Sequence, residues 1–237
     1  MAEPTVTELD VVEDFTATGR CDEGFLHVRR LRVRNVRSDG SHSAVYRVDV
    51  VDRPRLDAVA CLVWRRGAAG HLEILTRQNL RPAAYFRKDK VPNVPDGRTH
   101  LFCEEIVAGV MEEADVGEAG VRARAAAEVH EEAGYVVDPA RVQPLGAPFF
   151  VAPGILSEKI FLTAVDVTGL EPEPAPGDGT PMEEGGAISW RSVAAVQKAI
   201  ADGVIQDAKT ELALGRFLAQ QQAAKAATST SSTWSST

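Results

Sequence analysis

Three glutamates, Glu128, Glu131 and Glu132, lie close together near the middle of the chain. In a helix, Glu128 and Glu132 are one turn apart and project from the same side, with Glu131 beside them. Three neighbouring acids repel one another unless a cation is present. Carboxylate oxygens suit Mg²⁺ or Mn²⁺, and Mg²⁺ usually shares its coordination with substrate phosphates. The spacing therefore indicates a metal site, and the alternative is a solvated acidic helix surface.

The helix that would carry these acids is predicted over residues 117–133. Small and apolar residues recur at every fourth position from Val121 to Ala133, which is the stripe of a helix that packs on a core. Gly134 follows and is suited to end the helix in a left-handed conformation. One side of the helix thus faces a core, while the other carries the carboxylates.

The run Ala127–Tyr135, AEVHEEAGY, resembles the signature R-E-U-x-E-E-x-G-U of the Nudix hydrolase family, in which U is a large apolar residue. Upstream, Ala108-Gly109 matches the glycine that opens this signature, and Gly117-Glu118 resembles its middle. The chain departs from the pattern in two ways. Ala127 replaces the arginine, and the loop over 112–118 is longer. Arg124, one turn before Glu128, is the candidate replacement for the missing arginine.

Two further segments resemble the ADP-ribose pyrophosphatase branch of the family, which hydrolyses nucleoside diphosphate sugars. The first is RQNLRP over residues 77–82, and the second is PGILSEKIFL over residues 153–162. The resemblance implies five substrate-binding residues, which are Arg77, Arg81, Pro153, Gly154 and Glu158.

The resemblance also implies the metal ligands and the catalytic residues. Glu128, Glu131, Glu132 and the carbonyl of Ala108 would hold the metal, with Glu131 also catalytic. In this branch a glutamate on a later loop activates the attacking water. Here the loop follows the proline- and glycine-rich run 171–179, and Glu183 and Glu184 are both candidates. The alternative for them is a solvated acidic loop.

The implied reaction is Mg²⁺-dependent (or Mn²⁺-dependent) hydrolysis of the diphosphate in ADP-ribose or a related sugar nucleotide. ADP-ribose would give AMP and ribose 5-phosphate. The bound ion would neutralise the diphosphate and lower the pKa of a water. UDP-glucose or GDP-mannose are alternative substrates. Ala127 and the longer loop motivate a third alternative, a degenerate domain that binds a nucleotide without cleaving it.

The implied fold class is α/β, a Nudix α/β/α sandwich around a mixed sheet, preceded by an N-terminal antiparallel β module. The predicted division is a polar segment 1–20, the β module 21–54, the hydrolase domain 55–219 and a low-complexity, frayed tail 220–237. Alternating or apolar runs predict strands over 25–37, 43–51, 57–65, 71–78, 101–109 and 187–190. Residues 83–100, which mix prolines, a glycine and charges, are predicted to form a long loop. Ser192 and Asp207 are predicted to cap two helices. A lone hairpin is marginal in water, and the family's module commonly swaps between subunits, so we expect a homodimer.

Composition limits the partners. The chain has 237 residues and a formal net charge of -8, which argues against general binding to nucleic acid or an anionic membrane. Three widely spaced cysteines form neither a disulfide framework nor a zinc motif, which is typical of a cytoplasmic protein. The N-terminus has acids where a signal peptide is basic. We therefore expect a cytoplasmic protein whose partners are a nucleotide sugar and a second copy of itself.

Overall fold

The structure is a computed structural model that describes residues 6–7, 11–12, 18–20, 22–68, 70–177 and 179–231. Most of the predicted polar segment 1–20 and residues 232–237 of the predicted tail lie outside the described residues. Among the residues described, no helix is long and apolar enough to cross a membrane.

A mixed sheet of eight strands forms the centre of the fold. Strands β3 and β9 run parallel side by side in its middle, and every other pairing in the sheet is antiparallel. The run 58–63 is almost wholly buried, as its continuous apolar sequence predicts. The strands are β3 (Ala58–Arg66), β4 (Leu72–Leu80), β5 (Phe102–Glu105), β6 (Val107–Val110), β7 (Gln143–Pro144), β8 (Phe149–Phe150), β9 (Lys159–Asp166) and β10 (Ile188–Ser192).

The strand predicted over 101–109 is divided in two, which corrects the sequence-based boundary. Strands β3 and β4 pair only near their hairpin turn, from Trp64 opposite Ile74 to Arg66 opposite Leu72. Beyond that point β5 pairs with β4 and β6 pairs with β3. The chain therefore changes partner at Ile106, whose N–H donates to Oγ1 of Thr210 at 3.0 Å instead of to a strand.

Helix α2 (Gly117–Ala133) covers one face of this sheet, over the predicted range. Its buried Ala125 and Val129 pack in one core cluster with Val59 and Cys61 of β3. Gly134 ends the helix with a φ of 74°, a left-handed conformation that glycine adopts without steric cost. The apolar stripe read from the sequence is thus confirmed as the core-facing side of α2.

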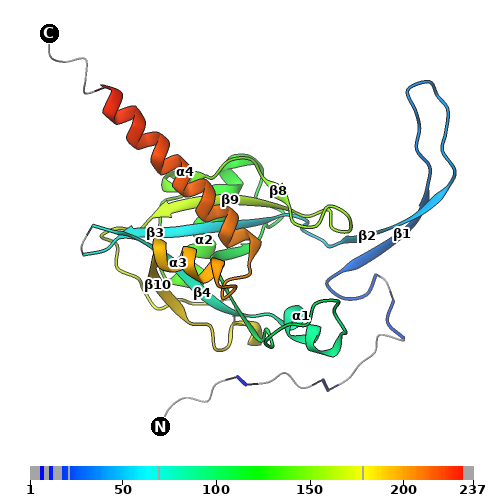
Figure 1. Ribbon diagram of the computed structural model, residues 1–237, viewed down its shortest axis with the longest axis horizontal. Helices are drawn as coiled ribbons and strands as arrows, with labels where there is room; N and C mark the ends of the chain where they lie inside the picture. Colours follow the sequence, from blue (N-terminus) through cyan, green and yellow to red (C-terminus); the bar gives the residue numbers. More distant parts are fainter. Residues whose placement is uncertain are drawn as a thin grey trace.

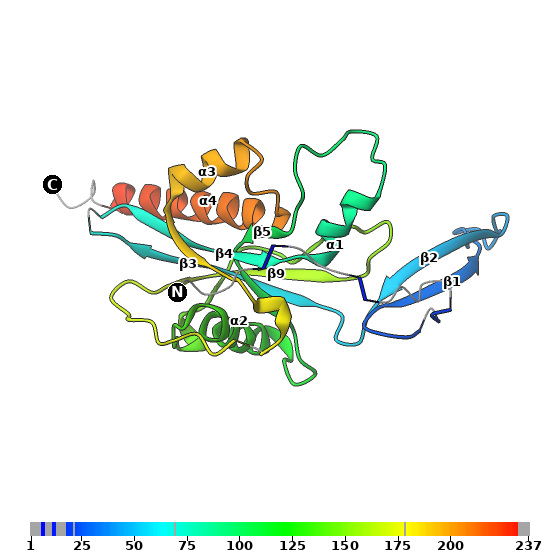
Figure 2. The same ribbon diagram turned by 90° about the horizontal axis from the view of Figure 1, so that it is seen from below.

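Helices α3 (Val193–Ala201) and α4 (Ala208–Ser231) cover the opposite face, giving three layers (Figure 2). Ser192 caps α3 by accepting from the N–H of Ala195 at 3.2 Å. Asp207 caps α4 by accepting from the N–H of Thr210 at 2.9 Å. Both predicted caps are confirmed. Helix α4 continues beyond residue 219 to Ser231, through a run rich in alanine and glutamine, which favour helix.

The N-terminal strands β1 (His27–Val33) and β2 (Tyr46–Asp52) form a separate antiparallel hairpin that projects from the main body (Figure 1). The hairpin predicted from alternating residues is therefore confirmed. The backbone N–H of Val51 donates to the carbonyl of Ile155 at 2.8 Å, which ties the base of the hairpin to the loop before β9. Side-chain contacts of Asp52 with Ser157 and of Arg53 with Glu158 reinforce that junction.

The segment predicted as a loop over 83–100 begins with helical turns. Helix α1 (Pro82–Tyr85) is followed by a 3-10 helix (Phe86–Asp89), and the rest is irregular. Pro82 at the first helical position explains the start, because proline has a helical φ and needs no hydrogen bond there. Two more 3-10 turns cover Pro139–Arg141 and Pro181–Glu183.

Candidate functional site

A cavity of about 670 Å³ lies between the C-terminal half of α2, the strands β4 and β6, and the 3-10 turn at Pro181–Glu183. Five glutamates and four arginines line it, so both charge signs meet there. The predicted site residues at its wall are Arg77, Arg81, Ala108, Glu128, Glu131, Glu132 and Glu183. The fold thus gathers side chains that are more than a hundred positions apart in the sequence.

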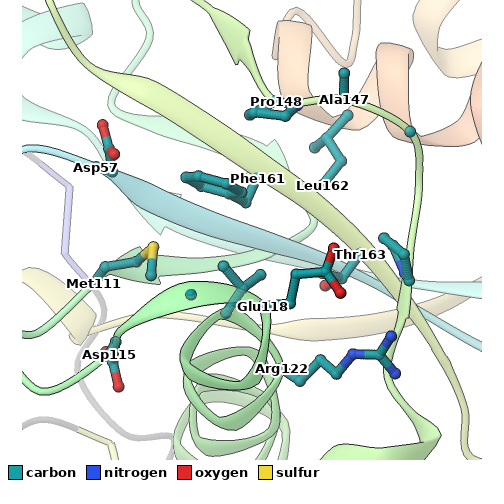
Figure 3. A pocket seen from close by; sticks show the side chains of 14 residues that line it. Asp57, Met111, Asp115, Glu118, Arg122, Ala147, Pro148, Phe161, Leu162 and Thr163 are labelled. Carbon is teal, nitrogen blue, oxygen red and sulfur yellow. The ribbon is translucent and has the colours of Figure 1, made fainter.

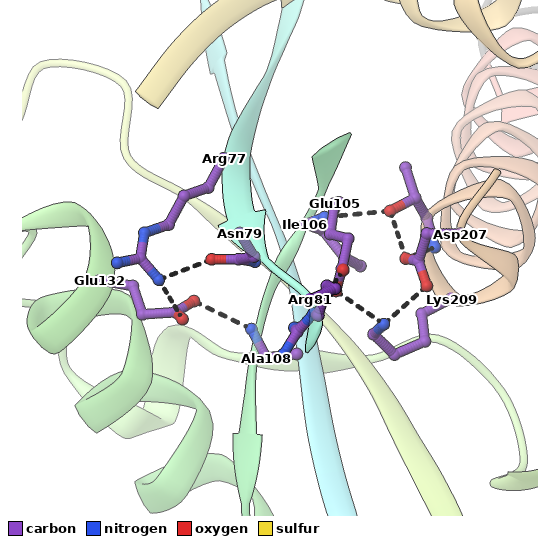
Figure 4. A network of polar contacts seen from close by, with 10 residues as sticks. Arg77, Asn79, Arg81, Glu105, Ile106, Ala108, Glu132, Asp207 and Lys209 are labelled. Atoms are coloured by element: carbon purple, nitrogen blue, oxygen red, sulfur yellow. Dashed lines mark hydrogen bonds and ion pairs between the residues drawn. The ribbon is translucent and has the colours of Figure 1, made fainter. Parts of the chain in front are cut away.

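Glu132 is the most constrained acid of this cavity. Its Oε1 accepts from Nη1 of Arg77 at 2.7 Å, and its Oε2 accepts from the N–H of Ala108 at 3.1 Å (Figure 4). Burial raises the pKa of Glu132 to about 7, while Arg77 and the Ala108 amide oppose that rise. Burial outweighs the charge of Arg77, so the carboxylate is not fully compensated by its protein partners.

Glu128 lies against the backbone of Gly109. A β-carbon at Gly109 would overlap the Glu128 carboxylate, so glycine is what lets this acid approach β6. Nη1 of Arg124 lies 3.8 Å from Oε1 of Glu128, and Nε of Arg124 donates to Asp115 at 2.8 Å. Arg124 therefore occupies the position beside Glu128 that the sequence suggested for it in place of an arginine at Ala127.

The loop that precedes Glu183 is tied to the end of α2. The N–H of Glu173 donates to the carbonyl of Gly134 at 2.8 Å. The N–H of Gly177 donates to the carbonyl of Glu131 at 3.0 Å. Glu183 then reaches the cavity, with its Oε1 3.4 Å from Nη2 of Arg77. Glu184 is exposed and does not line the cavity, so the two candidate bases occupy different positions.

The predicted residues Pro153, Gly154 and Glu158 are not brought into this cavity. Pro153 is exposed, and Gly154 borders a shallow depression beside the hairpin strands β1 and β2. Glu158 forms an ion pair with Arg53, and it is Arg53 that lines the cavity.

Arg53 and Phe25 are cavity residues that sequence reasoning missed. Both come from the ends of the hairpin, and the Arg53 guanidinium carbon lies 5.4 Å from the centre of the Phe25 ring. The sequence placed Phe25 at the start of the strand predicted over 25–37 and Arg53 near the end of the β module. Nothing local in the sequence shows where the hairpin meets the main sheet.

Two of the carboxylates that would bind a metal ion already have protein partners. Within the described part of the chain, no group of three or more His, Cys, Asp or Glu side chains is arranged so that it could hold a metal ion. Arg77 and Ala108 occupy the oxygens of Glu132, and Arg124 approaches Glu128. The donor chemistry nevertheless suits Mg²⁺, because the cavity offers carboxylates from one helix and a strand backbone beside them.

A second cavity, of about 540 Å³, lies at the N-terminal end of α2 (Figure 3). Its wall combines apolar residues such as Met111, Phe161 and Pro148 with four charged ones, which are Asp57, Asp115, Glu118 and Arg122. None of the predicted site residues lines it. The cavity beside the C-terminal half of α2 is therefore the candidate site, because the predicted metal-binding and catalytic groups gather there.

Comparison of the sequence with protein-family models and with curated proteins finds no match for this chain. The Nudix resemblance accordingly stays a prediction, carried by the residues themselves.

Proposed function

We propose that this protein is a Nudix-type hydrolase that cleaves the diphosphate of ADP-ribose or a related nucleoside diphosphate sugar in a Mg²⁺-dependent reaction. The observation that carries the proposal is the shared cavity. Glu128, Glu131 and Glu132 of α2 line it together with Ala108 of β6 and Glu183 of a distant loop. A structural acidic helix surface would not require these separate segments to converge.

The layered arrangement supports the same proposal. The signature-like helix α2 lies on one face of a mixed sheet with α3 and α4 on the other, which is compatible with a Nudix α/β/α sandwich. The acids project from the end of α2 nearest to β6 and the Glu183 loop. This is where the family resemblance would put the reacting diphosphate.

Glu128, Glu131, Glu132 and the carbonyl of Ala108 would hold Mg²⁺. When bound, Mg²⁺ would neutralise charge on the diphosphate and make the attacking water more acidic. Glu132 would exchange its contact with Arg77 for the cation, and Arg77 would then be available to a phosphate oxygen. Guanidinium groups bind phosphate through paired, charge-assisted hydrogen bonds.

Glu183 is our choice for the general base. It lines the cavity beside Arg77, whereas Glu184 is exposed outside it. A base must come within hydrogen-bond reach of the water whose proton it takes. Glu183 would accept that proton while the water oxygen bonds to one phosphorus and the bridging P–O bond breaks, leaving a nucleoside monophosphate and a sugar phosphate.

Phe25 and Arg53 supply a flat apolar ring and a guanidinium at another part of the cavity. Such a pair suits a planar nucleobase, because rings and guanidinium groups stack on aromatic faces.

Formation of the nucleoside monophosphate and the sugar phosphate tests the proposal. Products of ADP-ribose, UDP-glucose and GDP-mannose would be measured with Mg²⁺, with Mn²⁺ and with EDTA. We expect turnover with metal only. Glu183→Gln should lower turnover by on the order of a hundredfold or more, the range for a general base. Glu184→Gln is the matched control and should change it little. Absence of turnover on all three substrates, with either metal, would refute the proposal.

Nucleotide binding without cleavage is the alternative that one observation favours. In the described residues the acids are engaged by Arg77, Ala108 and Arg124, and no metal-holding group is formed. Calorimetric binding of ADP-ribose without turnover, and without an effect of Mg²⁺ on affinity, would identify this function.

A homodimer is the assembly we propose. One face of the hairpin carries Leu31 and Val33 opposite Val48 and Tyr46, and nearly half of Tyr46 is exposed. Leu31, Val33 and Val48 are only half-buried. A two-stranded sheet with a partly exposed apolar face is marginal on its own, and a second copy would cover it. Size-exclusion chromatography with light scattering should give twice the chain mass; the mass of one chain would refute the dimer.

A further inference from the structure

Behind the cavity, four charged side chains form a largely buried network that ends on the partly exposed Arg81. Nε and Nη2 of Arg81 donate to the two carboxylate oxygens of Glu105 at 2.7 and 2.8 Å (Figure 4). Glu105 is 3% exposed, and it also accepts from Nζ of Lys209 at 3.0 Å. Lys209 is held in turn by Oδ1 of Asp207 at 2.6 Å.

The network is anchored to the first turn of α4. Oδ2 of Asp207 accepts from both the N–H and the hydroxyl of Thr210, at 2.9 and 2.7 Å. The Thr210 hydroxyl oxygen also accepts from the N–H of Ile106, the residue after Glu105. Residues at the start of α4, in the helix layer opposite α2, thus fix the orientation of Glu105 through Lys209 and Ile106. Glu105 in turn orients Arg81.

Arg81 is the one member of the network that faces the cavity, with 37% of its side chain exposed. Its Nε and Nη2 are both directed to Glu105. Among the described residues, its Nη1 has no hydrogen-bond partner, so this nitrogen can still donate to an anion. A bidentate pair holds a guanidinium in one plane, which sets the direction of the remaining donor.

The charges of the network balance one another. Two carboxylates and two cations are present, and Lys209 shares the charge of Glu105 with Arg81. Glu105 orients Arg81, and Lys209 and Asp207 hold Glu105 in place.

We propose that Glu105, supported by Lys209 and Asp207, is a positioning residue that fixes Arg81 to bind a phosphate group of the nucleoside diphosphate. This inference rests on the proposed function for the identity of the ligand. Glu105 itself does not line the cavity. It acts on binding only through the arginine.

Glu105→Gln keeps the shape of the side chain but removes its charge, and it tests the proposal in the full-length protein. We expect the KM for ADP-ribose with Mg²⁺, and the Kd for ADP measured calorimetrically in EDTA, to rise about tenfold, as for loss of one charge-assisted contact. We expect kcat to stay within about threefold, because the reacting groups are untouched.

Glu104→Gln is the matched control. Glu104 lies next to Glu105 on β5, is equally buried at 4% exposure, and is paired with Arg191 away from the cavity. Glu104→Gln should lower stability about as much as Glu105→Gln does, without changing KM or the Kd for ADP. A general loss of packing would move both variants alike and would overturn the proposal.

A double-mutant cycle with Arg81→Ala tests whether Glu105 affects ligand binding through Arg81. If Glu105 acts through Arg81, then Glu105→Gln should have no further effect on ADP binding once Arg81 is alanine. An unchanged effect in that background would overturn the proposal. Should Glu105→Gln not fold, Lys209→Met carries the same test, with a smaller rise in Kd expected and no rise overturning it.

The two proposals fail separately. If the wild type hydrolyses no sugar nucleotide but binds ADP and shows this coupling, the hydrolase is refuted and the positioning role stands. If it hydrolyses ADP-ribose but the coupling is absent, the positioning role alone is refuted.

Discussion

Arg77 of β4 and Glu132 of α2 form a largely buried ion pair across the sheet–helix interface, with Nη1 2.7 Å from Oε1 and about a tenth of each side chain exposed. The pair joins one predicted substrate-binding residue to one predicted metal ligand. In the absence of a cation, Arg77 thus supplies the positive charge that the acidic end of α2 needs.

Replacing Arg77 by methionine should destabilise the fold. Removing one partner of a buried pair leaves an uncompensated charge, which typically costs about 3–5 kcal/mol. Glu132 can take up a proton in response, so the loss should be smaller at pH 6 than at pH 8. Urea unfolding at both values measures it. The double variant Arg77→Met with Glu132→Gln should recover much of the stability, and an equal loss in both variants would contradict this account.

The stability of the protein should depend on the protonation of Glu132. Its pKa is about 7 in the folded protein, above the ordinary value of 4.5 that applies to the unfolded chain. Between these two values the folded state holds more protons than the unfolded state. The contribution of Glu132 is therefore complete below about pH 4.5 and is lost as the pH rises to about 7, at up to ~1.4 kcal/mol per pH unit.

Glu132→Gln provides the reference for that dependence. The free energy of unfolding of the wild type should fall relative to this variant as the pH is raised from 5 to 7, and the difference should level off above that range. Parallel curves for the two proteins, measured in urea without divalent cations, would show that Glu132 does not titrate there.

Gly109→Ala should separate function from stability. The added methyl would take the place of the Glu128 carboxylate, which is the end of a flexible side chain and can rotate away. We expect little change in Tm but a fall in turnover by on the order of tenfold, because a ligand of the proposed Mg²⁺ has moved. Gly97→Ala, where the surroundings are open, is the control and should leave turnover unchanged. Equal turnover in the two variants would count against a role for Glu128.

Gly215→Ala in α4 should stabilise the protein by about 0.5–1 kcal/mol, because alanine costs less conformational entropy in a helix and the space around this position is open. Gly134→Ala should do the opposite, since Gly134 has a φ of 74° and a methyl there would strike the carbonyl of Glu173. Calorimetric unfolding of both variants tests the contrast; a rise in Tm for Gly134→Ala would show that the α2 cap differs from the one described.

The parts of the site that are local in sequence could be predicted from it. The extent of α2, its cap at Gly134 and the common side of Glu128 and Glu132 follow from helical period and from the conformational freedom of glycine. Arg124 beside Glu128 follows from the same period. Each of these features depends only on residues of α2 and its cap.

What could not be predicted depends on how distant segments meet. The pairing of Arg77 with Glu132 requires the registers of β4 and α2 together. The entry of Phe25 and Arg53 into the cavity requires the docking of the hairpin. The division of the strand at Ile106 follows from the separation of β3 and β4, which hydrophobic alternation within residues 101–109 does not encode.

Only one residue separates β5 from β6, so the fold depends on the number of residues at this bend as much as on their side chains. Glu105 pairs with Arg77 on one neighbour, and Val107 pairs with Cys61 on another, with Ile106 as the only spacer. Since side chains alternate between the two faces of a strand, one inserted or deleted residue would move Ala108 and Gly109 to the opposite faces of the sheet. Descendants of this gene should therefore tolerate substitutions at this bend far more readily than changes in its length.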